Sequence, residues 1–172
     1  MNKNILMIIF LVLIVALTGA FYFYQKPVQN DYKNISYTIE GQTVTLKDGK
    51  AETEIAPGSA SKSVTTYYGN EVKGDFNGDG KEDVAFLLMQ NNGGSGTFFY
   101  IVAALKTSKG YAGTNGIFIG DRIAPQTTEF KDREIIVNYA DRKPDEPMVA
   151  HPTVGVSKYF KIASGELVEV LK

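Results

Sequence analysis

The most specific chemistry in the chain lies in one short acidic segment, residues 75–83 (DFNGDGKED). It carries oxygen-bearing side chains at positions 1, 3, 5 and 9 and a glycine at position 6, where the backbone must turn sharply. Such a loop suits Ca²⁺, which prefers six to eight oxygen ligands in a flexible shell, better than Mg²⁺, which demands a tighter octahedron. The predicted Ca²⁺ ligands are the side chains of Asp75, Asn77, Asp79 and Asp83 and the backbone carbonyl of Lys81.

The segment resembles the DxDxDG calcium loops of FG-GAP-type proteins, integrin-like propeller blades and dockerins, with Asn77 in place of the middle aspartate. It departs from an EF-hand, because Phe86 stands at position 12, where an EF-hand has a bidentate glutamate. The resemblance implies an ion site but no fold, since propellers of that type need several such loops and this chain has one copy. In the alternative interpretation, the Asn-Gly and Asp-Gly pairs are only tight-turn residues.

All three arginines follow an aspartate, as in Asp121-Arg122 and Asp141-Arg142. These pairs could form a rim that grips a carboxylate or a sugar, but surface salt bridges are the favoured interpretation. An exported hydrolase would instead use Asp121 and Asp141 as a carboxylate pair. The hydrolase hypothesis requires both aspartates and the arginines that follow them, Arg122 and Arg142, to converge in one cleft.

Three further features carry weaker signals. The glycine-rich segment 91–96 lacks the Lys-Ser/Thr of a phosphate loop and predicts a mobile hairpin tip that can contact a partner. His151 lies in a proline-rich stretch and predicts a solvated loop residue. Tyr67, Tyr68 and Tyr100 could stack on a glycan, although packing in the core is the default for such residues.

Hydrophobic patterning predicts that these residues are positioned by β-strands. Residues 35–56 alternate between apolar and polar and contain Asp48-Gly49, a strong hairpin signal, so they predict a three-stranded meander. Continuous apolar runs at 84–89 and 98–105 predict strands buried on both faces. With further alternation toward the C-terminus, at least eight short strands predict a mainly β fold, an antiparallel β-sandwich or barrel-like domain.

The N-terminal segment has a different composition. Residues 5–24 carry no charge, and a stretch of about 18 apolar residues is long enough to cross a bilayer as a helix. Lys3 favours a cytoplasmic N-terminus. Residues 1–24 therefore predict the anchor of a single-pass cell-membrane protein with an extracytoplasmic C-terminal domain. Alternatively, they form a signal sequence that is cleaved near Ala20, in which case the domain is secreted.

The rest of the chain is interpreted as a linker, residues 25–33, and an extracytoplasmic β domain, residues 34–172. The absence of cysteine excludes disulfide scaffolds and thiolate zinc sites, and a net charge of −1 gives no reason to expect nucleic-acid binding. In layout the chain resembles small exported bacterial proteins. It is expected to be a membrane-tethered, calcium-binding module of the cell envelope with a protein or glycan partner. The alternatives are the hydrolase above and an envelope inhibitor or assembly factor presenting residues 91–96.

Overall fold

The computed structural model describes residues 31–55 and 58–172, which form one short 3-10 helix and twelve strands. The predicted transmembrane span, residues 5–24, lies outside the described residues, and within these residues no helix is long and apolar enough to cross a membrane. The elements are η1 (Tyr32–Asn34), β1 (Ser36–Ile39), β2 (Gln42–Thr45), β3 (Lys50–Glu54), β4 (Lys62–Gly74), β5 (Asp83–Asn91), β6 (Phe98–Thr107), β7 (Gly110–Gly113), β8 (Asn115–Asp121), β9 (Ala124–Lys131), β10 (Glu134–Asp141), β11 (Val154–Ala163) and β12 (Glu166–Val170).

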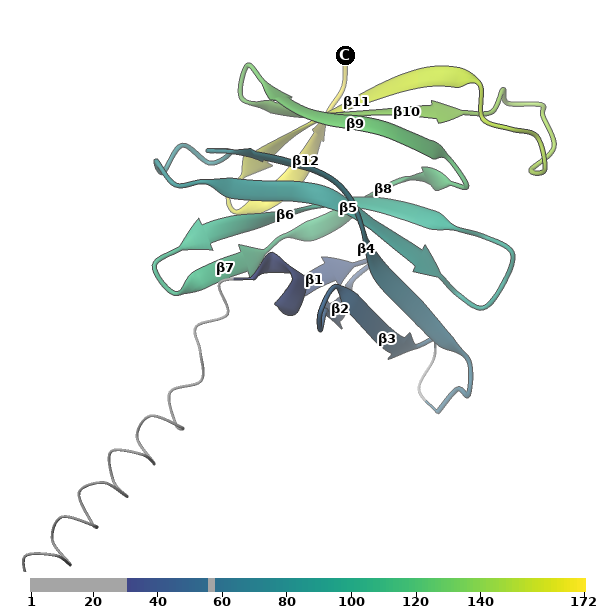
Figure 1. Ribbon diagram of the computed structural model, residues 1–172, viewed down its shortest axis with the longest axis horizontal. Helices are drawn as coiled ribbons and strands as arrows, with labels where there is room; N and C mark the ends of the chain where they lie inside the picture. The colour runs from purple at the N-terminus through teal and green to yellow at the C-terminus, as the bar shows by residue number, and fades with distance from the viewer. Residues whose placement is uncertain (1–30, 56–57) are drawn as a thin grey trace, which may run out of the picture.

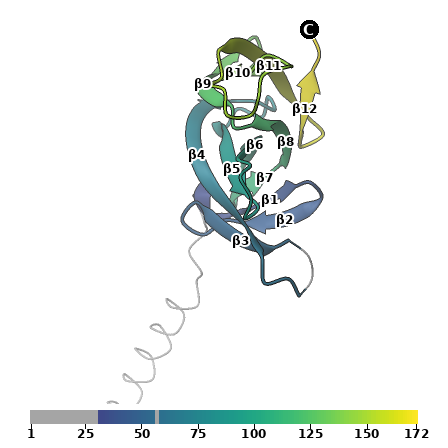
Figure 2. The same cartoon turned by 90° about the vertical axis from the view of Figure 1, so that its right-hand side faces the viewer.

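The first eight strands form one sheet that curls into a nearly closed barrel. Its order is β2-β1-β8-β6-β5-β4-β3, with β7 paired to β6, and Figure 2 shows this ring from one end. The seam lies between β2 and β3, and the turn that connects these two strands is closed by the bridge between Lys47 and Lys50. All pairs in the barrel are antiparallel except β1 with β8, which is parallel. The prediction of a mainly β, barrel-like fold is therefore confirmed.

The last four strands form a second sheet, in the order β12-β11-β10-β9, which covers one side of the barrel (Figure 1). Val84, Phe86 and Leu88 of β5 point into the barrel, whereas the alternate residues Ala85 and Leu87 pack toward the second sheet. β6 is shared between the two cores in the same way. This arrangement confirms the prediction that the continuous apolar runs are strands buried on both faces.

The first hairpins follow the turn signals in the sequence, but their pairing differs from the predicted meander. Asp48 and Gly49 have φ values of +50° and +79°, as a type I′ turn requires. β3 does not continue along β2, because five of its residues pair with β4 instead. The third strand of the predicted meander therefore crosses the seam and closes the barrel.

One end of the barrel is filled by aromatic rings. The Tyr32 ring centroid lies 5.5 Å from that of Phe86 and 5.8 Å from that of Tyr111. Tyr32 belongs to residues 31–33, the described part of the predicted linker, so these residues contribute directly to the folded domain. We call this cluster the aromatic plug; its members are Tyr32, Tyr37, Tyr67, Phe86 and Tyr111.

Candidate functional site

The acidic loop between β4 and β5 is folded around the carboxylate of Asp75. Asp75 Oδ1 accepts hydrogen bonds from the backbone N–H groups of Gly78 (2.8 Å) and Asp79 (3.0 Å), and its Oδ2 accepts one from Gly80 (2.9 Å). Gly78 and Gly80 have φ values of +79° and +80°, which residues with a Cβ rarely adopt. The two glycines thus let three successive amides converge on one side chain.

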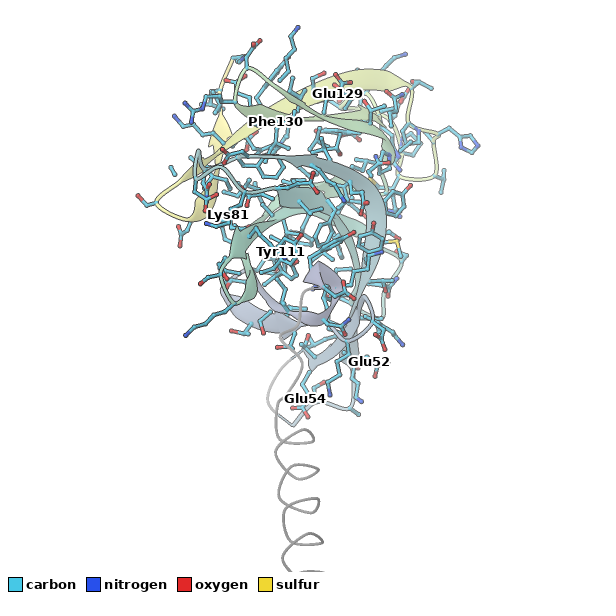
Figure 3. All side chains as sticks on the ribbon, turned by 60° about the vertical axis from the view of Figure 1, so that its left-hand side comes forward. Glu52, Glu54, Lys81, Tyr111, Glu129 and Phe130 are labelled. Atoms are coloured by element: carbon cyan, nitrogen blue, oxygen red, sulfur yellow. The ribbon has the colours of Figure 1, made fainter. Side chains whose placement is uncertain are left out.

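Asp79 faces a cation supplied by its own loop. Lys81 Nζ lies 2.8 Å from Asp79 Oδ2, and the backbone N–H of Lys81 donates to Asp79 Oδ1 at 3.0 Å. The hydrogen bond from the Lys81 side chain is the main reason that the pKa of Asp79 lies below its ordinary value. Asn77 is also exposed, and its Oδ1 accepts from the Asp79 N–H at 3.0 Å. Figure 3 shows Lys81 beside the second sheet and Tyr111 within the ring of strands.

Asp83 has a different environment, because it is fully buried at the start of β5. Its Oδ2 accepts from the backbone N–H of Phe76 at 3.0 Å, and its Oδ1 accepts from that of Lys106 at 2.8 Å. Burial raises the pKa of Asp83, and the charges of Asp79 and Asp75 raise it further, against the two backbone hydrogen bonds. Asp83 therefore connects the loop to the end of β6.

The predicted ligands are only partly brought together. Asp75, Asn77 and Asp79 lie in one turn, while the Asp83 carboxylate points at two amides. Within residues 31–55 and 58–172, no group of three or more acidic or histidine side chains is arranged to hold a metal ion. The donor set still suits a hard cation, since a carboxylate offers about four lone-pair positions and these bonds use only some of them.

The predicted carboxylate pair of a hydrolase converges with its arginines at the opposite end of the barrel. The Arg142 side chain is 7% exposed, and its guanidinium donates to the backbone carbonyls of Asp121 (3.2 Å), Arg122 (2.6 Å) and Ala150 (2.9 Å). We call Arg142 and these three carbonyls the arginine clasp. It joins the β8–β9 turn to the segment that follows β10, including Ala150.

Asp121 and Asp141 form hydrogen bonds to residues in and around the arginine clasp. Asp121 Oδ1 accepts from the Thr97 N–H at 2.8 Å, and Asp121 Oδ2 pairs with Arg122 at 2.8 Å. Burial alone would raise the pKa of Asp121, but these hydrogen bonds and the charge of Arg122 hold it below its ordinary value. A general acid needs the opposite shift. Asp141 accepts from the Arg142 N–H at 2.7 Å, so the geometry favours a structural role for both carboxylates.

The weaker predicted features are dispersed. The 91–96 tip is closed by its own bonds, with the Gly93 N–H donating to Asn91 Oδ1 at 2.8 Å. His151 is exposed. Of the tyrosines considered for glycan stacking, Tyr100 is 2% exposed and packs inside the barrel, whereas Tyr68 is 44% exposed.

The barrel also contains a polar cavity that was not predicted from the sequence. It has a volume of about 130 Å³ and lies at the barrel end opposite the aromatic plug. One signal for it was present in the sequence. Gln90 is a polar residue near the end of the apolar strand β5, and the alternation of side chains along a strand places it on the same inner face as Phe86 and Leu88. We call this cavity the mouth pocket; it is lined by Ile39, Glu40, Gln42, Val44, Ile55, Ser63, Gln90 and Asn92.

Two arrangements of functional interest therefore emerge, the acidic loop at one end of the barrel and the mouth pocket at the other. The function of each is inferred from the geometry of its own residues. Comparison of the chain with protein-family models, curated proteins and solved structures finds no significant match in any of the three.

Proposed function

We propose that the protein is a membrane-tethered, extracytoplasmic binding domain of the cell envelope whose 75–83 loop holds one structural Ca²⁺. The observation that carries the ion site is the turn that brings Asp75, Asn77 and Asp79 together around the backbone amides of residues 78–80, and the electrostatics of the loop support it. The charges of Asp79 and Asp75 contribute to the raised pKa of buried Asp83. The same three carboxylates raise the pKa of Lys81, mainly through its hydrogen bond to Asp79. A divalent cation would relieve the repulsion that Lys81 only partly offsets.

A structural ion suits this position because the loop connects β4 to β5, the strand shared by both cores. Extracellular calcium modules bind with dissociation constants of about 10⁻⁴–10⁻³ M. Ca²⁺ at ten to a hundred times its dissociation constant adds about 1.4–2.7 kcal/mol to the free energy of unfolding. The Lys81 side chain must leave Asp79 for the ion to bind, while its backbone carbonyl remains a ligand.

The proposed tether and binding role are consistent with the placement of the described residues. A tether through residues 5–24 would join the described domain at η1, beside the aromatic plug and at the barrel end opposite the mouth pocket. Catalysis lacks comparable support, because Asp121 and Asp141 are engaged with backbone amides.

The ion site is tested by thermal unfolding of the full chain in lipid nanodiscs, with 5 mM Ca²⁺ or with EGTA. We expect Ca²⁺ to raise the melting temperature by about 3–8 °C, and Mg²⁺ to raise it less. Asp75→Asn and Asp79→Asn should abolish the shift. Glu82→Gln is the matched control, because Glu82 lies in the same loop but pairs with Lys73 on the surface. An unchanged melting temperature in Ca²⁺ would overturn the ion site.

Lys81→Met provides a sharper test, since it removes the competing cation but keeps the backbone carbonyl. Calcium affinity should increase several-fold in this variant, measured by calorimetric titration. A plain turn without an ion site predicts no calcium heat in either protein.

A further inference from the structure

The barrel interior changes from apolar to polar toward the mouth pocket. Ser63, Thr65 and Gln90 are each at most 7% exposed. Gln90 Nε2 donates to Thr65 Oγ1 at 3.0 Å, and no hydrogen bond from a described residue reaches the Gln90 carboxamide oxygen. Gln90 lines the pocket, so this oxygen is open toward it and can accept a hydrogen bond from a bound molecule.

The polar groups of the pocket combine donors and acceptors without a positive charge. Ser63 Oγ donates to Asn92 Oδ1 at 2.6 Å, and no hydrogen bond within the described residues uses the Asn92 amide nitrogen. Glu40 Oε1 accepts from the Tyr100 hydroxyl at 2.8 Å, and Glu40 forms no salt bridge within the described residues. The lining holds one carboxylate and no lysine or arginine, so it disfavours anions.

An exposed aromatic ring, that of Phe118, is connected to this pocket through Tyr100 and Glu40, although Phe118 is not one of the lining residues. Phe118 pairs with Tyr100 across β8 and β6 and therefore points to the same, inner side of the barrel, yet it is 44% exposed. Its ring centroid lies 5.6 Å from that of Tyr100, whose hydroxyl reaches Glu40, and 6.4 Å from that of Phe98. An inward-facing but exposed phenylalanine offers a flat apolar surface beside the polar groups.

We propose that the mouth pocket binds one neutral sugar residue of an envelope glycan. Amide, hydroxyl and carboxylate groups together can pair with the vicinal hydroxyls of a sugar, each of which both donates and accepts. Phe118 would pack against the apolar C–H face of the ring. The volume of about 130 Å³ is sufficient for one sugar ring. This assignment rests on the proposal that the domain acts by binding and names the class of its ligand.

The test uses the full chain in nanodiscs and saturation-transfer-difference NMR with three probes, cellotriose, chitotriose and trigalacturonate. We expect at least one neutral trisaccharide to bind saturably, with a dissociation constant below about 10 mM. The anionic trisaccharide should bind at least tenfold more weakly, because Glu40 repels it. Absence of binding by both neutral probes, or preference for the anionic one, overturns the assignment.

Matched variants locate the site. Phe118→Ala and Asn92→Ala should each weaken binding by about fivefold to tenfold. Tyr68→Ala is the control, because Tyr68 is equally exposed, at 44%, but packs on Phe99 of the outer core. Equal loss in the control, or no loss in Phe118→Ala, overturns the location.

The outcome is separable from that of the calcium experiment. Sugar binding without a calcium-dependent melting shift contradicts only the ion site. A calcium shift without sugar binding contradicts only the ligand assignment. Cleavage of a trisaccharide in the same samples would contradict the binding role itself.

Discussion

The two ends of the barrel are built from the same strands but have opposite chemistry. Along the inner face of β5, Phe86 lies within the aromatic plug, whereas Gln90 lines the mouth pocket. Each end also contains a glutamate that accepts from tyrosine hydroxyls. Glu71 accepts from Tyr32 and Tyr67 at one end, and Glu40 accepts from Tyr100 at the other.

Under the proposed function, the aromatic plug contributes stability and the mouth pocket contributes ligand binding. Filling one end with packed rings stabilises the barrel, while polar groups at the other end lower its stability but offer contacts to a ligand. The comparison therefore predicts that equivalent substitutions have large effects on folding at the plug and small ones at the mouth.

The largest contrast is expected between two phenylalanines. Phe86→Ala removes a ring that is 0% exposed and contacts three tyrosine rings, so the free energy of unfolding should fall by about 3–5 kcal/mol. Phe118→Ala removes a ring that is 44% exposed and should cost less than about 1 kcal/mol. Urea unfolding followed by circular dichroism measures both. Similar losses would contradict the division between the two ends.

Within the acidic loop, buried Asp83 can be compared with exposed Asp79. Asp83→Ala removes a carboxylate that accepts hydrogen bonds from the buried N–H of Phe76 and the half-buried N–H of Lys106, which should cost about 2–5 kcal/mol. Asp79→Ala in the absence of calcium should cost far less, because Asp79 is exposed. If the two variants lose equal stability in EGTA, Asp83 does not connect the loop to β6 as described.

The arginine clasp gives an intermediate effect at the mouth end. Arg142→Met keeps the apolar stem but leaves three carbonyls without their donor, with an expected loss of about 2 kcal/mol. Amide hydrogen exchange should increase locally, at Thr97 and Arg122, before it increases in β5. Arg133→Met is the control, since Arg133 is exposed. Uniformly faster exchange across the barrel would contradict a local clasp.

Sequence patterning predicted the strands better than their partners. Uninterrupted apolar residues at 84–89 and 98–105 can be solvated on neither face, so burial from both sides followed directly. Pairing of β3 with β4 was not predictable, because closing a barrel depends on twist and register between distant segments. β4 was also missed, since its inner residues include Ser63 and Thr65, which do not resemble core positions.

The candidate sites were predictable to a similar degree. The spacing of Asp75, Asn77 and Asp79 indicated a tight loop, and the structure folds one there. The burial of Asp83 depends on Lys106, 23 residues away, and no local pattern signals such a contact. The mouth pocket was missed because five separate strand regions contribute one or two residues each.

The smallest predicted effect concerns the two tyrosine–glutamate contacts. Burial is the largest of the causes that raise the pKa of Tyr32 to about 12, followed by its hydrogen bond to Glu71 and the charge of Glu71. Burial and Glu40 likewise raise the pKa of Tyr100. Since a folded-state pKa above the unfolded value of 10.0 stabilises only the protonated form, the contribution of Tyr32 is complete below pH 10 and is lost between pH 10 and about 12.

Carbon-13 NMR of labelled tyrosines can follow both groups through this pH range. Glu71→Gln should lower the pKa of Tyr32 and leave Tyr100 unchanged, because the two contacts lie at opposite ends of the barrel. Glu40→Gln should do the reverse. A neutral sugar in the mouth pocket should perturb only the Tyr100 titration, since Tyr100 shares Glu40 with the pocket. A response of Tyr32 to either Glu40→Gln or the sugar would show that the two ends are coupled, which the separation of stability from binding excludes.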